Sequence, residues 1–284
     1  MKRYVYKLGL FLTLPSILFL LTLVIYPLIY NIYLSLHEFD FIKNTFLFTG
    51  FANYASLLFD PVFQRAFLNT IIFTLASTSL ELVLGLILAI LISWFLPFGK
   101  RLARTLIITP YFLAAVTAAY TWKYLLVPVY GLINNLLGLE VPWLSDPTLA
   151  LISIIIADAW KTAPFFFLIF SAAIESIPKT YIEAIRVDGA STWQELRYVV
   201  IPYLIPYMLV GLVIRSIDAF TKCFDIVYIL TGGGPASATE VLPTLSFHYM
   251  FEYLKWGKAS ATALISVITT LVLIIIYMRM LRRR

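Results

Sequence analysis

The chain has 284 residues, of which 61% are apolar and 13% are charged, whereas a soluble domain has roughly 45–50% apolar and 25% charged residues. This composition argues against a water-soluble fold, and the long apolar blocks predict an all-α polytopic membrane protein. The single cysteine, Cys223, excludes an intrachain disulfide and a metal site built from several thiolates. The net charge is +6, and in a membrane protein the positions of the charges along the chain are more informative than their sum.

Six nearly uncharged runs are long enough to cross a bilayer, which takes about 20 apolar residues in a helix. We expect spans over 8–30, 66–95, 102–127, 149–174, 199–220 and 259–278. The first run follows three basic residues, as a signal peptide does. Its length and the lack of a cleavage motif favour a retained span, which Pro15 and Pro27 should bend.

The basic residues predict the orientation, because cytoplasmic flanks carry an excess of Lys and Arg. With the N-terminus inside, 13 of the 21 basic residues lie in inner segments, and five lie in the outer segments 31–65, 123–148 and 223–258. We therefore expect both termini in the cytoplasm and a multi-pass protein of the cell (inner) membrane. One transmembrane domain should occupy 1–284.

The inner loop 177–202 has more structure than a connector needs. Asp188 and Gly189 should end a first short helix. Thr192, followed three residues later by Glu195, fits a capping box and should begin a second helix. Two short helices that meet at a glycine could form a rigid knob for a cytoplasmic partner.

The loop resembles a signature of the permease subunits of binding-protein-dependent ABC importers, whose pattern is Glu-Ala-Ala-x3-Gly-x9-Ile-x-Leu-Pro. The matching residues are Glu183, Ala184, Gly189 and Pro202, and apolar substitutions stand at Ile185, Val199 and Ile201. In that family the loop is a coupling helix that inserts into a cleft of the ATPase subunit. The resemblance assigns this coupling role to Glu183, Ala184, Ile185, Asp188, Gly189 and Ala190.

Other segments resemble the first-type permease of the carbohydrate branch, which includes maltose and glycerol-phosphate permeases. They are Gly-Phe-Ala-Asn-Tyr at 50–54, Asn-Thr at 69–70, 81–89, Trp-Leu-Ser-Asp-Pro at 143–147, and Thr-Gly-Gly-Gly-Pro at 231–235. The resemblance implies the type I ABC importer transmembrane fold, with a permease core over 66–280 that carries the coupling loop 177–202.

The same resemblance implies the partners. These are a second-type permease subunit, two copies of a cytoplasmic ABC ATPase, an extracellular or periplasmic sugar-binding protein, and membrane lipid. ATP and Mg would be bound by the ATPase, so we expect no cofactor on this chain. Nucleic acid is not expected as a partner.

The sequence shows no catalytic or metal site. The glycines at 232–234 lack the Gly-x4-Gly-Lys-Ser/Thr spacing of a phosphate-binding loop, and their outer position suggests a flexible turn. The two histidines, His37 and His248, have no metal-ligand spacing. An intrinsic enzyme is therefore not expected.

Charged residues inside two of the spans have two interpretations. Asp158 and Lys161 are three apart, Arg215 and Asp218 are three apart, and Asp218 and Lys222 are four apart, so each pair can share a helical face. Because buried charges must face protein or water, these residues either line a substrate path or join helices as ion pairs. Aromatic residues in the spans, such as Trp122 and Trp160, could likewise stack on a sugar or serve only in packing.

The leading functional hypothesis is a transmembrane permease subunit of an ATP-driven sugar importer. The alternative is an ion-coupled secondary transporter of a small polar solute, in which the intramembrane charges would be the coupling site. A membrane-embedded enzyme is a third class, but no cluster of His, Asp or Glu supports it. The identity of the sugar is not encoded in any motif.

Overall fold

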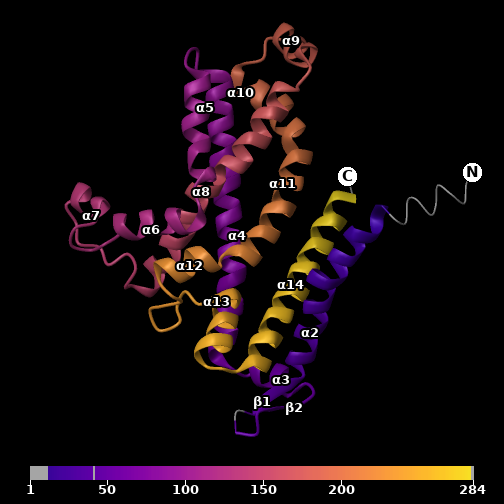
Figure 1. Cartoon of the computed structure of the whole chain (residues 1–284). Helices are drawn as coiled ribbons and strands as arrows, with labels where there is room; N and C mark the ends of the chain where they lie inside the picture. Colours follow the sequence, from indigo (N-terminus) through magenta and orange to yellow (C-terminus); the bar gives the residue numbers. More distant parts are fainter. Residues whose placement is uncertain (1–11, 41, 283–284) are drawn as a thin grey trace, which may run out of the picture. The chain divides into compact units, whose positions relative to one another are not determined.

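The computed structural model describes residues 12–40 and 42–282 (Figure 1). By their contacts the residues form two compact units, Met1–Phe63 with Leu245–Ile265, and Gln64–Thr244 with Ser266–Arg284. Each unit is described by itself. The expected single membrane domain over 1–284 stays a prediction.

The first unit combines a long apolar helix with a small hairpin. The helix runs over Leu12–Ser35 and ends as α2, Tyr26–Ser35. The antiparallel strands β1, His37–Asp40, and β2, Thr45–Phe48, pair His37 with Phe48, and α3, Ala52–Leu58, follows. This hairpin is a departure from a purely helical chain.

Two side chains hold the hairpin against its neighbours. The Asn53 amide donates to the carbonyl oxygens of Ser35, at 2.9 Å, and His37, at 3.1 Å. The ring of Trp256, at the start of α14, stacks on Phe39 with 4.7 Å between centroids. The hairpin therefore has its own aromatic and polar core.

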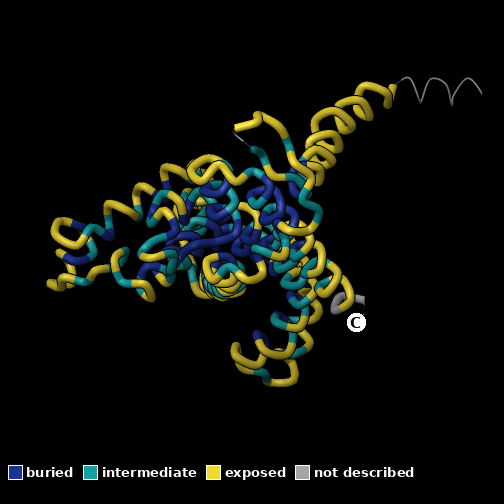
Figure 2. Tube along the Cα trace, turned by 90° about the horizontal axis from the view of Figure 1, so that it is seen from below, coloured by how far each residue is buried: buried dark blue, intermediate teal, exposed yellow. Residues whose placement is uncertain are grey.

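The long first helix exposes its apolar side chains. All residues from Leu12 to Tyr30 are exposed, and Figure 2 shows this helix in yellow along most of its length. A helix that is apolar on every side is typical of a membrane span. Its surface is suited to lipid or to a neighbouring transmembrane helix.

The second unit contains most of the remaining helices. They are α4 (Pro61–Ile90), α5 (Lys100–Ile108), α6 (Ala115–Leu125), α7 (Leu132–Leu137), α8 (Pro147–Glu175), α9 (Lys179–Val187), α10 (Thr192–Glu195), α11 (Ile201–Lys222), α12 (Phe224–Leu230), α13 (Leu242–Phe247) and α14 (Trp256–Arg282). Helices α4, α13 and α14 each have part of their length in the first unit. A π-helical segment, Leu91–Phe95, extends α4, and another, Leu196–Val200, joins α10 to α11.

Helices α4, α8 and α11 pack closely because glycines face a phenylalanine. A Cβ at Gly85 in α4 would lie 2.5 Å from the Cβ of Phe166 in α8, and one at Gly211 in α11 would lie 2.7 Å from its ring. Small residues at such positions let transmembrane helices approach closely. Phe166, Phe167 and Phe170 are fully buried in the resulting core.

Local signals explain where α8 begins. The side chain of Asp146 accepts hydrogen bonds from the backbone amides of Thr148 and Leu149, both at 2.9 Å, and Pro147 occupies the first turn. A capping aspartate and a proline in the first turn are both favourable at a helix N-terminus.

The expected spans correspond to long helices of the structure. Five helices are long and apolar enough to cross a membrane, namely Leu12–Ser35, Pro61–Phe95, Pro147–Glu175, Thr192–Lys222 and Trp256–Arg279. Four of the expected runs lie inside these helices. The first expected run begins at Leu8, and residues 8–11 lie outside the described part of the chain.

The third expected run, 102–127, is broken. Lys100–Phe112 and Ala115–Leu125 are bent by 99° relative to each other, and they add a sixth span if the pair crosses as one. The break follows the tight turn Thr109–Phe112, which contains Pro110, and the backbone is extended at Leu113. Hydropathy does not reveal such a bend, because both arms are apolar.

Candidate functional site

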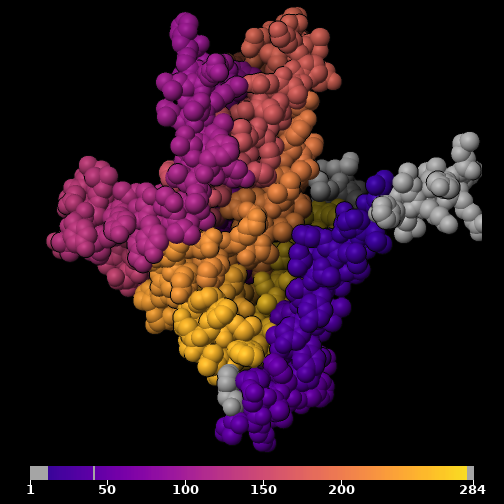
Figure 3. Space-filling model, in the orientation of Figure 1, coloured from indigo at the N-terminus to yellow at the C-terminus, as the bar shows by residue number. Residues whose placement is uncertain are grey.

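The inner loop forms two short helices, α9 and α10, as the sequence predicts. Helix α9 ends at Val187, and Gly189 follows with φ of +80°. Because a Cβ at Gly189 would meet nothing within 4 Å, the backbone conformation alone favours glycine there. The space-filling view shows α9 and the turn after it as a protruding knob (Figure 3).

The cap of α10 differs from the prediction by one residue. Ser191, and not Thr192, is the N-cap, and the Gln194 side chain completes the capping box by accepting from the Ser191 amide at 2.7 Å. The predicted Thr192–Glu195 box is therefore wrong. The reason is that Glu195 is buried and is engaged by Arg186.

An ion pair joins the two short helices. Arg186 in α9 donates from Nε and Nη2 to the two carboxylate oxygens of Glu195, at 2.6 and 3.0 Å. The hydrogen bond and the charge of Glu195 raise the pKa of the Arg186 guanidinium. Since α10 continues through Leu196–Val200 into α11, this bidentate contact fastens α9 to the end of a transmembrane helix.

The predicted coupling residues are distributed over the surface of this knob. Glu183, Ala184, Asp188 and Gly189 are exposed, and Ile185 and Ala190 are half-buried. A groove of about 450 Å³ between α9 and the segment leading into α11 is lined in part by Ala184, Ile185 and Asp188. Exposed apolar side chains nearby, including Val187 and Trp193, are typical of a docking surface.

A second polar constellation lies inside the transmembrane part, around Arg215 of α11. Its guanidinium contacts Glu81 of α4 at 2.6 and 3.0 Å, Asp158 of α8 at 2.8 Å, and Asp218 at 3.0 Å. The Glu81 side chain is 0% exposed and that of Arg215 is 5% exposed. One arginine therefore joins three helices that are far apart in sequence.

Hydroxyl groups complete the buried part of this cluster. Ser77 lies 2.8 Å from Glu81 Oε1 and 2.5 Å from Asp158 Oδ2. Thr162 Oγ1 accepts from Arg215 Nη2 at 3.3 Å. Such hydrogen bonds lower the cost of keeping charges away from water.

Two of the three predicted pairs are present. Arg215 binds Asp218, and Lys222 Nζ lies 2.5 Å from Asp218 Oδ1. The pairing of Asp158 with Lys161 is wrong, because Asp158 turns toward Arg215, while Lys161 lies over the Tyr111 ring at 5.9 Å from its centroid.

The sequence interpretation missed Glu81 as a member of this cluster. The available signal was that Glu81 is the one charged residue in the expected span 66–95. One small pocket of about 120 Å³ is lined by all five predicted path residues, which are Asp158, Lys161, Arg215, Asp218 and Lys222. Glu81 is not part of its lining. This volume is below the roughly 300 Å³ at which ligand pockets usually begin.

Two further expectations concern the aromatic residues and the outer glycines. Trp122 and Trp160 meet edge to face, with 6.0 Å between centroids, so they pack on each other.

The turn around Gly232 is held by hydrogen bonds rather than loose. The Thr239 amide donates to the Gly233 carbonyl oxygen at 3.1 Å, and the Thr239 hydroxyl donates to the Gly234 carbonyl oxygen at 2.6 Å. Asn69 holds the residues that follow, by donating to the carbonyl oxygens of Ala238 and Glu240 at 2.9 and 3.0 Å. The described residues contain no cluster of His, Cys, Asp and Glu that could hold a metal ion.

The proteins to which this chain is similar are membrane components of transport systems. The family model for the binding-protein-dependent transport system inner membrane component matches residues 81–284. The chain is 35% identical over 286 residues to the trehalose/maltose transport system permease protein MalF of Thermococcus litoralis, covering 98% of this chain and 95% of that protein. It is 34% identical over 260 residues to the trehalose transport system permease protein SugA of Mycobacterium tuberculosis, covering 91% and 83% of the two chains.

The fold is also found among solved structures. A chain of a bacterial ABC transporter involved in the import of the acidic polysaccharide alginate superposes with a TM-score of 0.85 and 25% identity, covering 99% of this chain and 96% of that one. A chain of a bacterial alginate ABC transporter in complex with an alginate pentasaccharide-bound periplasmic protein superposes with the same TM-score of 0.85 and 25% identity. An amino acid ABC transporter shares the fold at a TM-score of 0.56 and 20% identity.

Proposed function

Because this chain belongs to the family of binding-protein-dependent transport system inner membrane components, we propose that it takes a sugar across the membrane for an ATP-driven importer. The chain is a multi-pass inner-membrane permease. A sugar substrate is supported by the names of its relatives, which are permeases for trehalose and maltose. The ion-coupled alternative is set aside, because the relatives are permeases of binding-protein-dependent systems.

The proposed assembly contains partners that supply what this chain lacks. A second-type permease completes the path, two cytoplasmic ABC ATPases hydrolyse ATP with Mg, and an external binding protein delivers the sugar. A solved relative that was crystallised with its periplasmic protein supports the last of these partners. Both termini and α9 would then lie on the cytoplasmic side.

The bidentate contact between Arg186 and Glu195 carries the proposed coupling mechanism. A movement imposed on α9 by the ATPase would pass through this ion pair into α10 and α11. Arg215 lies 20 residues beyond Glu195 on the same helix, which is about 30 Å at 1.5 Å per residue. The docking helix α9 and the intramembrane cluster would then be attached to the same helical segment, about 30 Å apart.

The charged residues of the cluster divide into two proposed roles. Glu81, Asp158 and Arg215 are buried and would hold α4, α8 and α11 together. Asp218 and Lys222 have side chains that are 38% and 76% exposed, so they are available to a polar solute. We assign these last two, with Lys161, to the substrate path.

The test replaces Gly189 by valine and Glu183 by lysine. Valine disfavours the positive φ at residue 189, and lysine reverses an exposed charge, so both variants should reduce ATPase co-purification and sugar uptake while the permease is still made. Gly189→Asn is the matched control, because asparagine tolerates this conformation better than valine does. Normal co-purification and uptake in both test variants would refute the proposed coupling role.

A further inference from the structure

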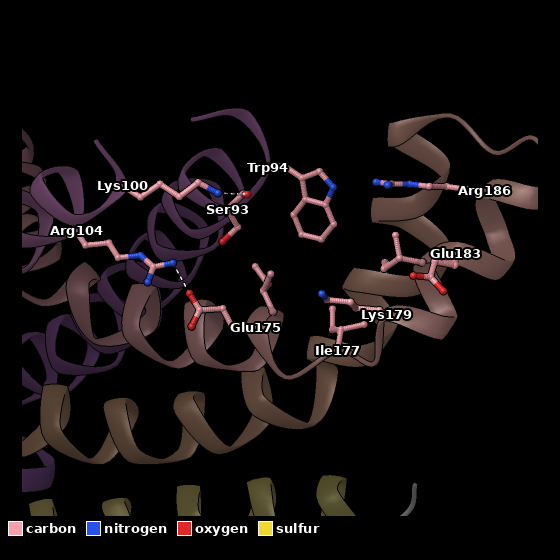
Figure 4. A pocket seen from close by; sticks show the side chains of 11 residues that line it. Ser93, Trp94, Lys100, Arg104, Glu175, Ile177, Lys179, Glu183 and Arg186 are labelled. Atoms are coloured by element: carbon pink, nitrogen blue, oxygen red, sulfur yellow. Dashed lines mark hydrogen bonds and ion pairs between the residues drawn. The ribbon is translucent and has the colours of Figure 1, made fainter. Parts of the chain in front are cut away.

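A further pocket, of about 480 Å³, lies where the ends of several helices meet beside α9. Its walls come from the end of α4, the start of α5, the end of α8 and α9. Figure 4 shows Trp94 and Lys179 extending into the space between them. The volume falls in the range of small-molecule sites, roughly 300–1,000 Å³.

The lining of this pocket has more positive than negative groups. Four basic residues, Lys100, Arg104, Lys179 and Arg186, face two carboxylates, Glu175 and Glu183. Arg104 is paired with Glu175, and Arg186 is engaged by Glu195. Among the described residues, Lys100 and Lys179 have no carboxylate partner, and the exposed Glu183 offsets only part of their charge.

Helix geometry adds to this positive potential. Lys100 is the first residue of α5 and Lys179 is the first residue of α9, so both helices begin at the pocket. The amino end of a helix carries a partial positive charge that favours anions.

Two buried polar atoms on the pocket wall lack a partner. Within the described part of the chain, Nε of Arg104 and Oγ of Ser93 are buried and make no hydrogen bond. Both residues line the pocket, and the Ser93 carbonyl already accepts from Lys100 Nζ at 2.9 Å. Unpartnered buried donors are rare in folded proteins, so each of these two groups is a candidate donor to an acceptor oxygen of a ligand.

Apolar residues that neighbour the pocket lining along the chain are typical of the membrane surface. Phe95, Phe98 and Leu102 lie between the end of α4 and the first turn of α5, and their side chains are exposed. Tryptophan is enriched where a protein crosses from hydrocarbon to water, and Trp94 stands at this point of the chain. A phosphate with attached acyl chains would meet cations in the pocket and apolar side chains outside it.

We propose that this pocket binds a phosphate-bearing anion, which is either the headgroup of an anionic phospholipid or a free phosphate compound. Lys100 and Lys179 neutralise its charge, while Ser93 and Arg104 supply the hydrogen-bond donors that have no partner within the chain. This site is separate from the intramembrane pocket, and it lies beside the proposed docking surface, with which it shares Glu183.

The test uses the full-length chain in nanodiscs of phosphatidylcholine, with and without phosphatidylglycerol, and native mass spectrometry to count bound lipid. Inorganic phosphate and glycerol 3-phosphate are added in separate arms. Retention of phosphatidylglycerol that the soluble anions do not displace identifies a lipid site. Binding of the soluble anions without lipid preference identifies a site for free phosphate compounds.

Two variants test the pocket itself. Ser93→Ala removes a hydroxyl without a partner in the described chain, so it should leave thermal stability in phosphatidylcholine unchanged while weakening anion binding. The double variant Lys100→Gln/Lys179→Gln should weaken binding about tenfold or more. Its matched control is Arg101→Gln/Arg197→Gln, since neither arginine lines the pocket. Equal loss in both double variants, or no binding of any anion, would overturn the proposal.

Discussion

Replacing Arg215 by methionine should destabilise the chain more than any other single change in the intramembrane cluster. The substitution removes the cation that contacts Glu81, Asp158 and Asp218. Two buried carboxylates would then face each other without a counter-charge, and breaking a buried ion pair in this way costs about 3–5 kcal/mol.

Substitutions of the other cluster residues should destabilise the chain less than Arg215→Met, in a defined order. Glu81→Gln leaves Arg215 with Asp158 and Asp218, so the loss is that of charge-assisted hydrogen bonds, about 1–3 kcal/mol. Asp218→Asn removes a partly exposed group, and such pairs contribute about 0–1 kcal/mol.

Unfolding of the purified variants by a denaturing detergent, followed by circular dichroism, measures these free energies. Lys222→Gln is the control, because its side chain is 76% exposed and should change stability little. In a double-mutant cycle, Arg215→Met combined with Glu81→Gln should cost less than the sum of the two single changes. Equal losses for Arg215→Met and Asp218→Asn, or additivity in the cycle, would refute the assignment of Arg215 to helix packing.

Three further predictions follow from individual residues. In a Cys223→Ser background, cysteines placed at Ser191 and Ser237 should react with an impermeant thiol reagent from opposite sides of the membrane, and labelling of both from one side would contradict the six-span topology. Ser191→Ala should lower stability by about 1 kcal/mol, whereas Thr192→Ala should have a smaller effect, because only Ser191 caps α10; thermal unfolding of the two variants compares them. Burial alone would raise the pKa of Asp60, but hydrogen bonds from a tyrosine hydroxyl and two backbone amides outweigh it and lower the pKa below 3.8. The resulting stability is present above the unfolded-state pKa and is lost as the pH falls below about 4, so Asp60→Asn should remove this part of the acid dependence of unfolding.

The positions of the spans could be predicted because they depend on local composition. A run of about 20 apolar residues is a property of the sequence itself, and four expected runs lie wholly inside helices of the structure. The end of the first short helix near Gly189 could be predicted in the same local way, because glycine readily adopts the positive φ found there. The 99° bend after Phe112 was not predictable from hydropathy, because it depends on a turn between two apolar arms.

Side-chain partners were harder to predict, since they depend on contacts between distant segments. Glu81 and Arg215 are 134 positions apart, and nothing local to either residue identifies the other. The same limitation explains the two wrong pairings. Asp158 has a lysine three residues away but binds an arginine on another helix, and Glu195 could have capped its own helix but binds Arg186 instead.

The two distant ion pairs have a common consequence for how this permease could transmit force. Arg186 and Glu195 fasten α9 at one end of the α10–α11 segment, and Arg215 fastens the same segment to α4 and α8 farther along. A helix fixed at only one point would turn or slide without moving its neighbours. A helix fixed at both points can pass a displacement of α9 to the residues that line the small intramembrane pocket. Weakening either attachment should therefore uncouple ATP hydrolysis from uptake, even where ATPase docking itself is preserved.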